Sequence, residues 1–371
     1  MPITKYRPKD IRHAASRAAI GVLAALALSA TAPQAGAAPL DPLAYASLGA
    51  LNLGAGQYTL LTDGALPTLR DAASNLLATG WYQAQADAFN PKAAVFSFDA
   101  IQVAAGAFVT ASGANPLALL SRGDIGFAGT LDAAGRVGGL QGAGAGGRGG
   151  PSGERGGNGG GDGEAGQGPG GGQGGYACLG NCGWGEGGAH GGAGSNWNPA
   201  RFPALAYGDP AVVLQGGSGG GAGGANLFGS RPGGGGGGGG VEFGALGNIL
   251  LSATALLNAS GGARLDGLAV NAGGGWGGGL LLHADSIELQ SQSRVDDSGF
   301  SGGRITFLTA SGPVAANTSG VSVGANFYGH EGVITYGTLA AVPEPASALL
   351  WLAGGSALLA WRRRPERPER R

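Results

Sequence analysis

Short runs of alternating apolar and polar residues recur along two parts of the chain, separated by glycine, asparagine or aspartate. A period of two places successive side chains on opposite faces of a strand, so each run predicts a strand of about three residues. In the first part the predicted strands cover residues 58–61, 95–98, 101–103, 108–110, 117–119, 125–127 and 130–132. In the second part they cover residues 241–243, 249–251, 256–258, 280–282, 287–289, 294–296 and 305–307.

The predicted strands follow a recurring order: a glycine stretch, a strand, a turn, a second strand, a turn and a third strand. One such three-strand unit cannot bury its inward residues alone and must stack on its neighbours. The order favours an all-β fold, a right-handed parallel β-helix (solenoid) with a long glycine-rich insertion. A β-sandwich is the alternative, but it needs longer strands and tight hairpin turns. We expect β coils over residues 38–140 and again over 241–340.

One stretch has helical spacing. Within residues 66–87, Leu69, Ala73, Leu76 and Leu77 fall at positions i, i+4, i+7 and i+8, and Gly80 follows as a helix-ending glycine would. The stretch therefore predicts a helix, with a strand beginning at residue 81 as the alternative.

Residues 141–240 hold more than half of the 82 glycines and few apolar side chains. Such a segment cannot offset its ordering entropy with a hydrophobic core, so a flexible insertion is the default expectation. Glycine also falls at every third position from Gly144 to Gly159. This spacing allows a second arrangement, in which extended helices with three residues per turn pack against the β coils. A collagen-like helix needs far more proline.

The last thirty residues combine three features in a fixed order. Pro343-Glu344-Pro345 comes first, an apolar stretch covers residues 346–361, and Arg362, Arg363 and Arg364 follow. The prolines hold an extended backbone that no helix or central strand accommodates. As a helix the apolar stretch is about 24 Å long, slightly short of a ~30 Å hydrocarbon core, and the arginines remain on the cytoplasmic side.

This order resembles the PEP-CTERM sorting signal of Gram-negative bacteria, which a membrane protease-transpeptidase called exosortase recognises. The resemblance is confined to residues 341–371. It implies that Pro343, Glu344 and Pro345 are the recognition residues and that the three arginines stop transfer through the inner membrane. It also implies an envelope or extracellular protein of a bacterium that makes exopolysaccharide. An ordinary tail anchor is the alternative, but an anchor does not need Pro-Glu-Pro.

The first 37 residues have the features of a signal peptide. Five basic residues precede an apolar core over residues 18–30, and Ala35-Gly36-Ala37 fits the small-residue cleavage pattern. We expect signal peptidase to cut between Ala37 and Ala38. A retained N-terminal anchor is the alternative, and the short apolar core disfavours it.

Charge is distributed unevenly along the chain. The leader and the segment after residue 361 contain eleven of the 22 basic residues and three of the 23 acidic ones, so the body between them has eleven basic and twenty acidic residues. Nucleic acid and anionic lipid need clustered Lys and Arg, so this balance argues against both as partners. It is compatible with solubility among polysaccharides, which are a candidate partner, or with weak cation binding. We expect no cofactor.

Cys178 and Cys182 are the only cysteines. In an oxidising compartment such a pair is first interpreted as a disulfide, and Gly180 with Asn181 lets the short loop bend. A zinc site formed by both sulfurs and His190 is the alternative. It has only three ligands where a structural site needs about four, so we expect no metal.

Two function classes remain. The first is an exported, non-catalytic surface or matrix protein associated with exopolysaccharide. The second is a polysaccharide-active lyase or hydrolase, which needs paired carboxylates or a carboxylate cluster with calcium and a basic residue. Its candidate residues are Asp296 and Asp297 near Arg294, and Asp285 with Glu288. Adjacent residues of a strand point to opposite faces, which weakens the first pair. Solvated charges at turns are the simpler interpretation, so we expect no enzyme.

Overall fold

The computed structural model describes residues 39–86, 90–139, 146, 148–177, 183–194, 205–225, 231–263, 272–300, 302–311, 314–316, 318–324 and 330–339. Over these residues the protein is all-β, as predicted. It has two short 3-10 helices, Pro42–Ala44 (η1) and Thr318–Gly320 (η2), and no α-helix in the described ranges. No helix in the same ranges is both long and apolar enough to cross a membrane.

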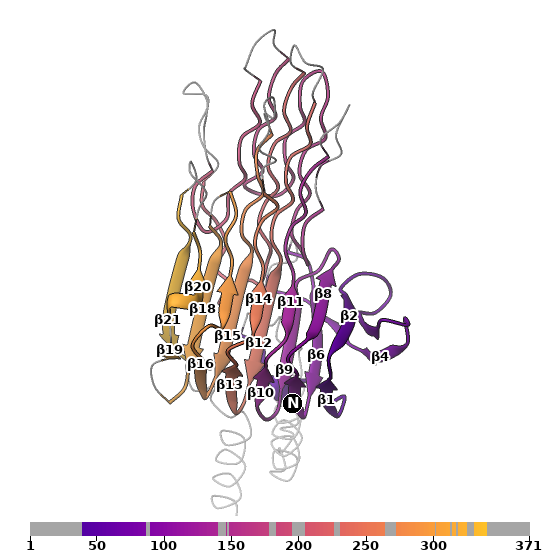
Figure 1. Cartoon of the computed structure of the whole chain (residues 1–371), viewed down its shortest axis with the longest axis vertical. Coiled ribbons are helices and arrows are strands. Elements are labelled where there is room, and N and C mark those ends of the chain that lie inside the picture. Colours follow the sequence, from indigo (N-terminus) through magenta and orange to yellow (C-terminus); the bar gives the residue numbers. More distant parts are fainter. Residues whose placement is uncertain are drawn as a thin grey trace, which may run out of the picture.

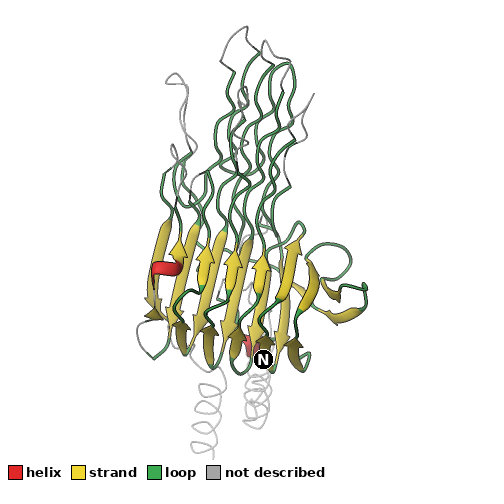
Figure 2. Cartoon of the chain, in the orientation of Figure 1, coloured by secondary structure: helices red, strands yellow, loops and turns green. Residues whose placement is uncertain are grey.

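The strands form three sheets (Figures 1 and 2). Sheet A contains, in spatial order, β1 (Ala50–Leu53), β7 (Ala100–Val103), β10 (Ile125–Phe127), β13 (Asn248–Leu251), β16 (Ser286–Leu289) and β19 (Ala315–Ala316). Sheet B contains β20 (Val321–Ser322), β17 (Arg294–Asp296), β14 (Leu256–Asn258), β11 (Thr130–Asp132), β8 (Ala107–Ser112), β2 (Gly56–Leu61), β3 (Thr68–Asp71) and β4 (Leu76–Thr79). Sheet C contains β21 (Val333–Thr338), β18 (Arg304–Thr309), β15 (Gly279–Ala284), β12 (Gly240–Ala245), β9 (Leu117–Ser121), β6 (Ala93–Phe98) and β5 (Trp81–Gln83).

From β6 onward the chain visits the sheets in a fixed cycle. It passes from sheet C to sheet A to sheet B, and then returns to sheet C beside the strand it left. Each strand of this part therefore pairs in parallel with its counterparts in the preceding and following cycles, for example β12 with both β9 and β15. Every strand predicted from the apolar alternation lies within an observed strand.

The core consists of columns of similar side chains. Parallel register aligns four isoleucines on sheet A: Ile101, Ile125, Ile249 and Ile287. On sheet C it aligns Phe96, Leu119, Phe243, Leu282 and Phe307. All of these side chains are buried in one continuous cluster. Apolar burial stabilises by about 25 cal/mol per Å², and here each cycle buries its inward face only because its neighbours are present.

The predicted helix within residues 66–87 is wrong. The strands β3, β4 and β5 occupy this stretch; β3 pairs antiparallel with β2 and β4, and β5 pairs antiparallel with β6. Leu69 is buried whereas Leu76 is about half exposed, so the apolar residues do not share one buried face. Ladder hydrogen bonds at the first edge of sheets B and C determine the structure here, because local spacing is a weak preference that tertiary contacts override.

Glycine-rich segments extend from the ends of the sheet B strands as a bundle and return to sheet C (Figure 1). We call this the glycine bundle; its described residues are 133–139, 146, 148–177, 183–194, 214–225, 231–239, 259–263 and 272–278. Backbone hydrogen bonds join its segments throughout the described part. It lies at the opposite end of the strands from β1 and the start of the described chain (Figure 1).

Residues 217–222 show how the bundle is packed. The N–H groups of the first and fourth residues donate to backbone carbonyls of residues 235–238. Those of the second and fifth residues donate to carbonyls of residues 186–189, and those of the third and sixth to carbonyls of residues 164–167. Their carbonyl groups accept bonds with the same repeat of three, from residues 154–157, 273–276 and 172–175. The segment therefore has six hydrogen-bonded neighbours and a repeat of three residues. This is the packing of extended three-per-turn helices that the glycine spacing allows.

The bundle needs glycine for space. A Cβ at Gly238 would overlap the carbonyl oxygen of Ala259, and a Cβ at Gly156 would overlap that of Gly234. Neither glycine has a φ in the left-handed region, so conformational freedom is not the reason for its presence. At these positions backbone packs directly against backbone, and backbone hydrogen bonds join the segments.

Candidate functional site

A repeated polar turn follows four strands of sheet B, and after β11 and β14 it leads into the glycine bundle. Four residues end neighbouring strands of the sheet in register: Asp132, Asn258, Asp296 and Ser322. Each side-chain oxygen accepts a hydrogen bond from the backbone N–H two residues later, at 3.1 to 3.4 Å. Asp, Asn and Ser favour such turns because their side chains reach the following backbone.

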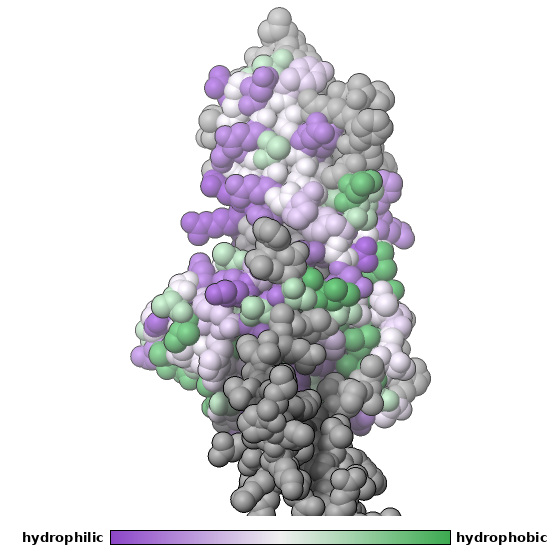
Figure 3. Space-filling view, turned by 180° about the vertical axis from the view of Figure 1, so that it is seen from behind, coloured by the Kyte–Doolittle hydropathy of each residue, from purple (hydrophilic) through white to green (hydrophobic). Residues whose placement is uncertain are grey.

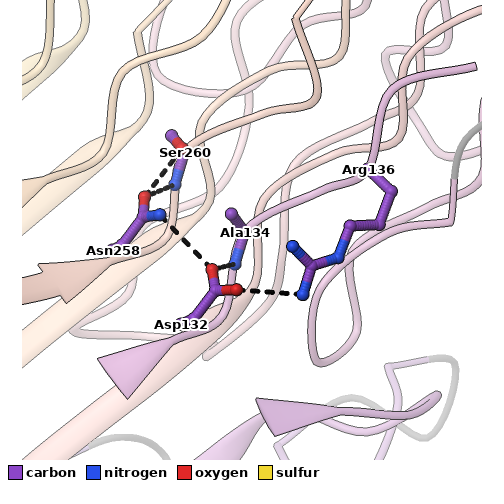
Figure 4. A network of polar contacts seen from close by, with 5 residues as sticks. All are labelled: Asp132, Ala134, Arg136, Asn258 and Ser260. Atoms are coloured by element: carbon purple, nitrogen blue, oxygen red, sulfur yellow. Dashed lines mark hydrogen bonds and ion pairs between the residues drawn. The ribbon is translucent and has the colours of Figure 1, made fainter. Parts of the chain in front are cut away.

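Figure 4 shows how two of these turns are joined. The Nδ2 of Asn258 donates to the Oδ1 of Asp132 at 3.3 Å, and the Nη2 of Arg136 lies 2.9 Å from the Oδ2 of Asp132. Along sheet B, the register places Asn258 between Asp132 and Asp296, so its neutral amide lies between their two carboxylates. Like charges directly opposite on neighbouring strands repel, so the neutral residue separates them.

Two segments cover the outer face of sheet C. The first packs Leu40, with Tyr45 beside it, onto Val95 and Leu120. The second packs Leu214 onto Leu281 and Leu308. Gln85 fixes the second segment, because its side chain donates to the carbonyl of Leu214 at 2.7 Å and accepts from the N–H of Leu214 at 2.8 Å.

Glu242 is fully buried beneath the first segment. Its Oε1 accepts from the N–H of Leu40 at 2.6 Å and lies 2.8 Å from the Nε2 of His283. Its Oε2 has no partner. Burial, followed by the charge of Glu242, raises the pKa of Tyr45. A buried carboxylate is costly unless it is hydrogen-bonded, so these contacts fasten the N-terminal segment to the sheet.

A cavity of about 330 Å³ lies beside this pair, at the end of the strands away from the glycine bundle. Its lining includes Pro39 and Leu339, the two ends of the described chain, together with His283 and Asp285. The chain therefore enters and leaves the described structure at the same place.

Two ionisable groups are buried where sheet C meets the bundle. Burial, and secondarily the charge of Arg304, lowers the pKa of His190 to about 3. Burial raises the pKa of Asp297 well above its ordinary value. Asp297 accepts a hydrogen bond from the N–H of Gly278 through Oδ1, whereas its Oδ2 has no partner.

The structure does not bring the enzyme candidates together. The side chain of Asp296 accepts from the N–H of Ser298 in its turn, and its Oδ2 lies 3.6 Å from the Nη2 of the exposed Arg294. The neighbouring Asp297 is completely buried. Asp285 lines the 330 Å³ cavity, and Glu288 is exposed on sheet A. These residues are parts of turns, the interior and the surface, and no two of the carboxylates face each other across a described cavity.

The other predicted site residues lie outside the described residues. These are Ala37 and Ala38, Cys178 and Cys182, and the tail residues Pro343, Glu344, Pro345, Arg362, Arg363 and Arg364. His190, the third ligand of the zinc alternative, packs edge-on against the ring of Tyr207 at 5.0 Å. The described ranges contain no group of three His, Cys, Asp or Glu side chains arranged for a metal ion.

The surface seen from behind carries polar residues spread over the glycine bundle, and apolar residues in small patches near its junction with the sheets (Figure 3). On this face the described glycine bundle presents polar side chains to solvent, whereas Glu186, His190 and Ser218 of the bundle are buried.

Sequence reasoning missed the Glu242–His283 pair and the burial of Asp297. The repeated order of strands could have predicted this pair, because it sets which residues of successive cycles are neighbours. The register of β12 and β15 places Gly244 opposite His283, so an acidic residue two positions earlier is its diagonal neighbour. No local pattern marks Asp297, because its burial depends on Gly278 of another segment.

Comparison with known proteins identified no relative of this chain. No protein-family model matches this chain, and no curated protein or solved structure matches it significantly.

Proposed function

We propose that this chain is an exported, non-catalytic cell-surface or extracellular-matrix protein, processed at its PEP-CTERM-like tail and associated with exopolysaccharide. We also propose that the three sheets form a right-handed parallel β-helix. The cycle through sheets C, A and B supports the β-helix, since it is the connectivity of stacked three-strand coils. The β-sandwich has less support, because antiparallel pairing occurs only in β2–β6 of the described chain.

One observation carries the proposal: both ends of the described chain lie at the base of the molecule and the glycine bundle lies at the other end. A tail that follows Leu339 therefore leaves from the base. A chain held there at the inner membrane, or by a processed C-terminus, directs its bundle away from the point of attachment. This is the geometry expected of a displayed protein.

A polysaccharide lyase or hydrolase is the alternative. It requires carboxylates that converge on a substrate, whereas Asp296 and Asp297 are used in a turn and in the interior. Fold alone does not imply activity.

The decisive experiment is the intact mass and C-terminal peptide map of the protein purified from native envelope and from the medium. We expect loss of everything after residues 342–345, and a mature N-terminus at Ala38. The variant Glu344→Ala should accumulate unprocessed in the inner membrane, while Glu366→Ala, beyond the arginines, should be processed normally. An intact chain ending at Arg371 in the inner membrane would show a simple tail anchor and overturn the sorting proposal.

A further inference from the structure

A second cavity, of about 450 Å³, lies over the outer face of sheet C where the sheet meets the glycine bundle. Its lining consists of Asn90, of Arg304, the first residue of β18, and of five residues from the segment that carries Leu214: Gly208, Asp209, Val212, Val213 and Gln215. We call it the junction cavity. It is separate from the 330 Å³ cavity at the base, and the two share no lining residue.

Arg304 is the only basic side chain among the residues that line this cavity, and one donor of its guanidinium has no partner. Its Nε is buried without a hydrogen-bond partner. In the described ranges it forms no ion pair. Its stem packs against Gly191, where a Cβ would come 3.0 Å from its Cγ. The chain thus places a half-buried positive group at the cavity, and no ion pair of the described residues neutralises it.

The buried ionisable groups nearby do not supply a counter-charge. His190 lies behind Gly208, where a Cβ would come 2.6 Å from its Nε2, and neither ring nitrogen has a partner. Its lowered pKa leaves it neutral. The raised pKa of Asp297 favours the uncharged acid. Asp209 is the one acidic residue of the lining; it is exposed, its carboxylate accepts from the N–H of Ala211, and it forms no described ion pair with Arg304.

The remaining lining suits a sugar. Asn90 and Gln215 offer amide donors and acceptors, and Val212 with Val213 offers an apolar wall. A planar guanidinium with an unused donor matches a carboxylate better than any neutral group. We propose that the junction cavity binds the carboxylate of an acidic sugar unit, with Arg304 as the anchoring residue. This rests on the proposed association with polysaccharide and names the class of polymer: one that contains uronic acid.

The test uses the mature protein and two probes, trigalacturonate and its methyl ester, with binding measured by calorimetry or saturation-transfer NMR. We expect trigalacturonate to bind and the methyl ester to bind at least ten-fold more weakly, because only the free acid pairs with Arg304. Arg304→Gln should lose ten-fold or more in affinity, the loss expected for a charge-assisted hydrogen bond. Arg294→Gln is the matched control, since Arg294 is exposed on sheet B and does not line the cavity; this variant should bind as the unaltered chain does.

Asp209→Asn should change the affinity for trigalacturonate in the opposite direction to Arg304→Gln. Removing a carboxylate from the cavity wall should tighten trigalacturonate binding several-fold. Weaker binding would instead indicate that Asp209 hydrogen-bonds a neutral diol. The proposal is overturned by equal binding of acid and ester, by retention of affinity in Arg304→Gln, by weaker binding in Asp209→Asn, or by no binding of trigalacturonate. Absence of trigalacturonate binding would not change the outcome of the C-terminal peptide map. An unprocessed tail would not change the binding result, so the two proposals can be tested separately.

Discussion

At the scale of single residues, the glycines of the bundle differ in what surrounds them. Gly238 lies where a Cβ would overlap the carbonyl oxygen of Ala259, whereas a Cβ at Gly161 meets no atom within 4 Å. Both positions are glycines of the same bundle. Only the first is required by packing, and this contrast gives a matched pair of substitutions.

Gly238→Ala should destabilise the protein by about 1–3 kcal/mol, because the added methyl forces two backbone segments apart. Gly161→Ala should be neutral or slightly stabilising, since alanine restricts the unfolded chain and finds open space. Urea unfolding of both variants measures the difference in the free energy of unfolding. Equal effects would show that the two segments are not in contact as described.

His190 makes stability depend on pH in a defined direction. Its pKa is lowered from 6.5 to about 3, so between these values the unfolded chain takes up a proton that the folded chain does not. Stability therefore falls as the pH falls through this window, by about 1.4 kcal/mol per pH unit at most. Asp297, whose pKa is raised, contributes in the opposite direction: its stabilisation is present at low pH and is lost as the pH rises through its folded-state pKa.

His190→Gln removes one of these two opposing groups. The stability of the variant relative to the unaltered chain should increase as the pH is lowered from 6 to 4, approaching a slope of about 1.4 kcal/mol per unit. Asp297→Asn should change the relative stability with the opposite sign over the same range. Denaturant midpoints measured at each pH provide the comparison, and a His190→Gln difference independent of pH would contradict burial of a neutral imidazole.

At the scale of elements, the bundle segment 217–222 should behave as regular secondary structure. Each of its six N–H groups donates to another segment, and exchange with solvent requires those bonds to open. Its amides should exchange as slowly as those of β12. The exposed turn at residues 72–74 is the fast-exchanging control. Exchange of residues 217–222 at the rate of an unfolded peptide would rule out the packed three-per-turn arrangement.

At the scale of the whole molecule, the opposed positions of the chain ends and the bundle predict unequal access in the anchored form. With both cysteines replaced by serine, Gly161→Cys places a thiol in the bundle, and Leu43→Cys places one at the base, where Leu43 is exposed. On cells, a maleimide carried by a large polyethylene glycol should label the bundle thiol faster, because the envelope obstructs the base. After release into the medium the two rates should become similar. Equal labelling on cells would contradict outward display of the bundle.

The sequence alone predicted β2, β6–β18 and the all-β class of fold, but not β1, β3, β4 or β19–β21. Alternation at residues such as Ile125-Gly126-Phe127 and Ile287-Glu288-Leu289 survives in the structure because one face of each strand is buried and the other is not. It also supplied the threefold glycine spacing, though not the choice between a loose insertion and a packed bundle. The tail, the leader and the cysteines are sequence predictions that the described residues do not reach.

Only the tertiary structure decided which segments became neighbours. The spacing of Leu69, Ala73, Leu76 and Leu77 favoured a helix locally, but pairing with β2 and β6 at the edge of the sheets made strands. Burial of Glu242, Asp297 and His190 depends on segments that are distant in the sequence, and so does burial of the Arg304 Nε without a hydrogen-bond partner. Periodicity is a property of a few consecutive residues, whereas burial and hydrogen-bond satisfaction depend on segments brought together by the fold.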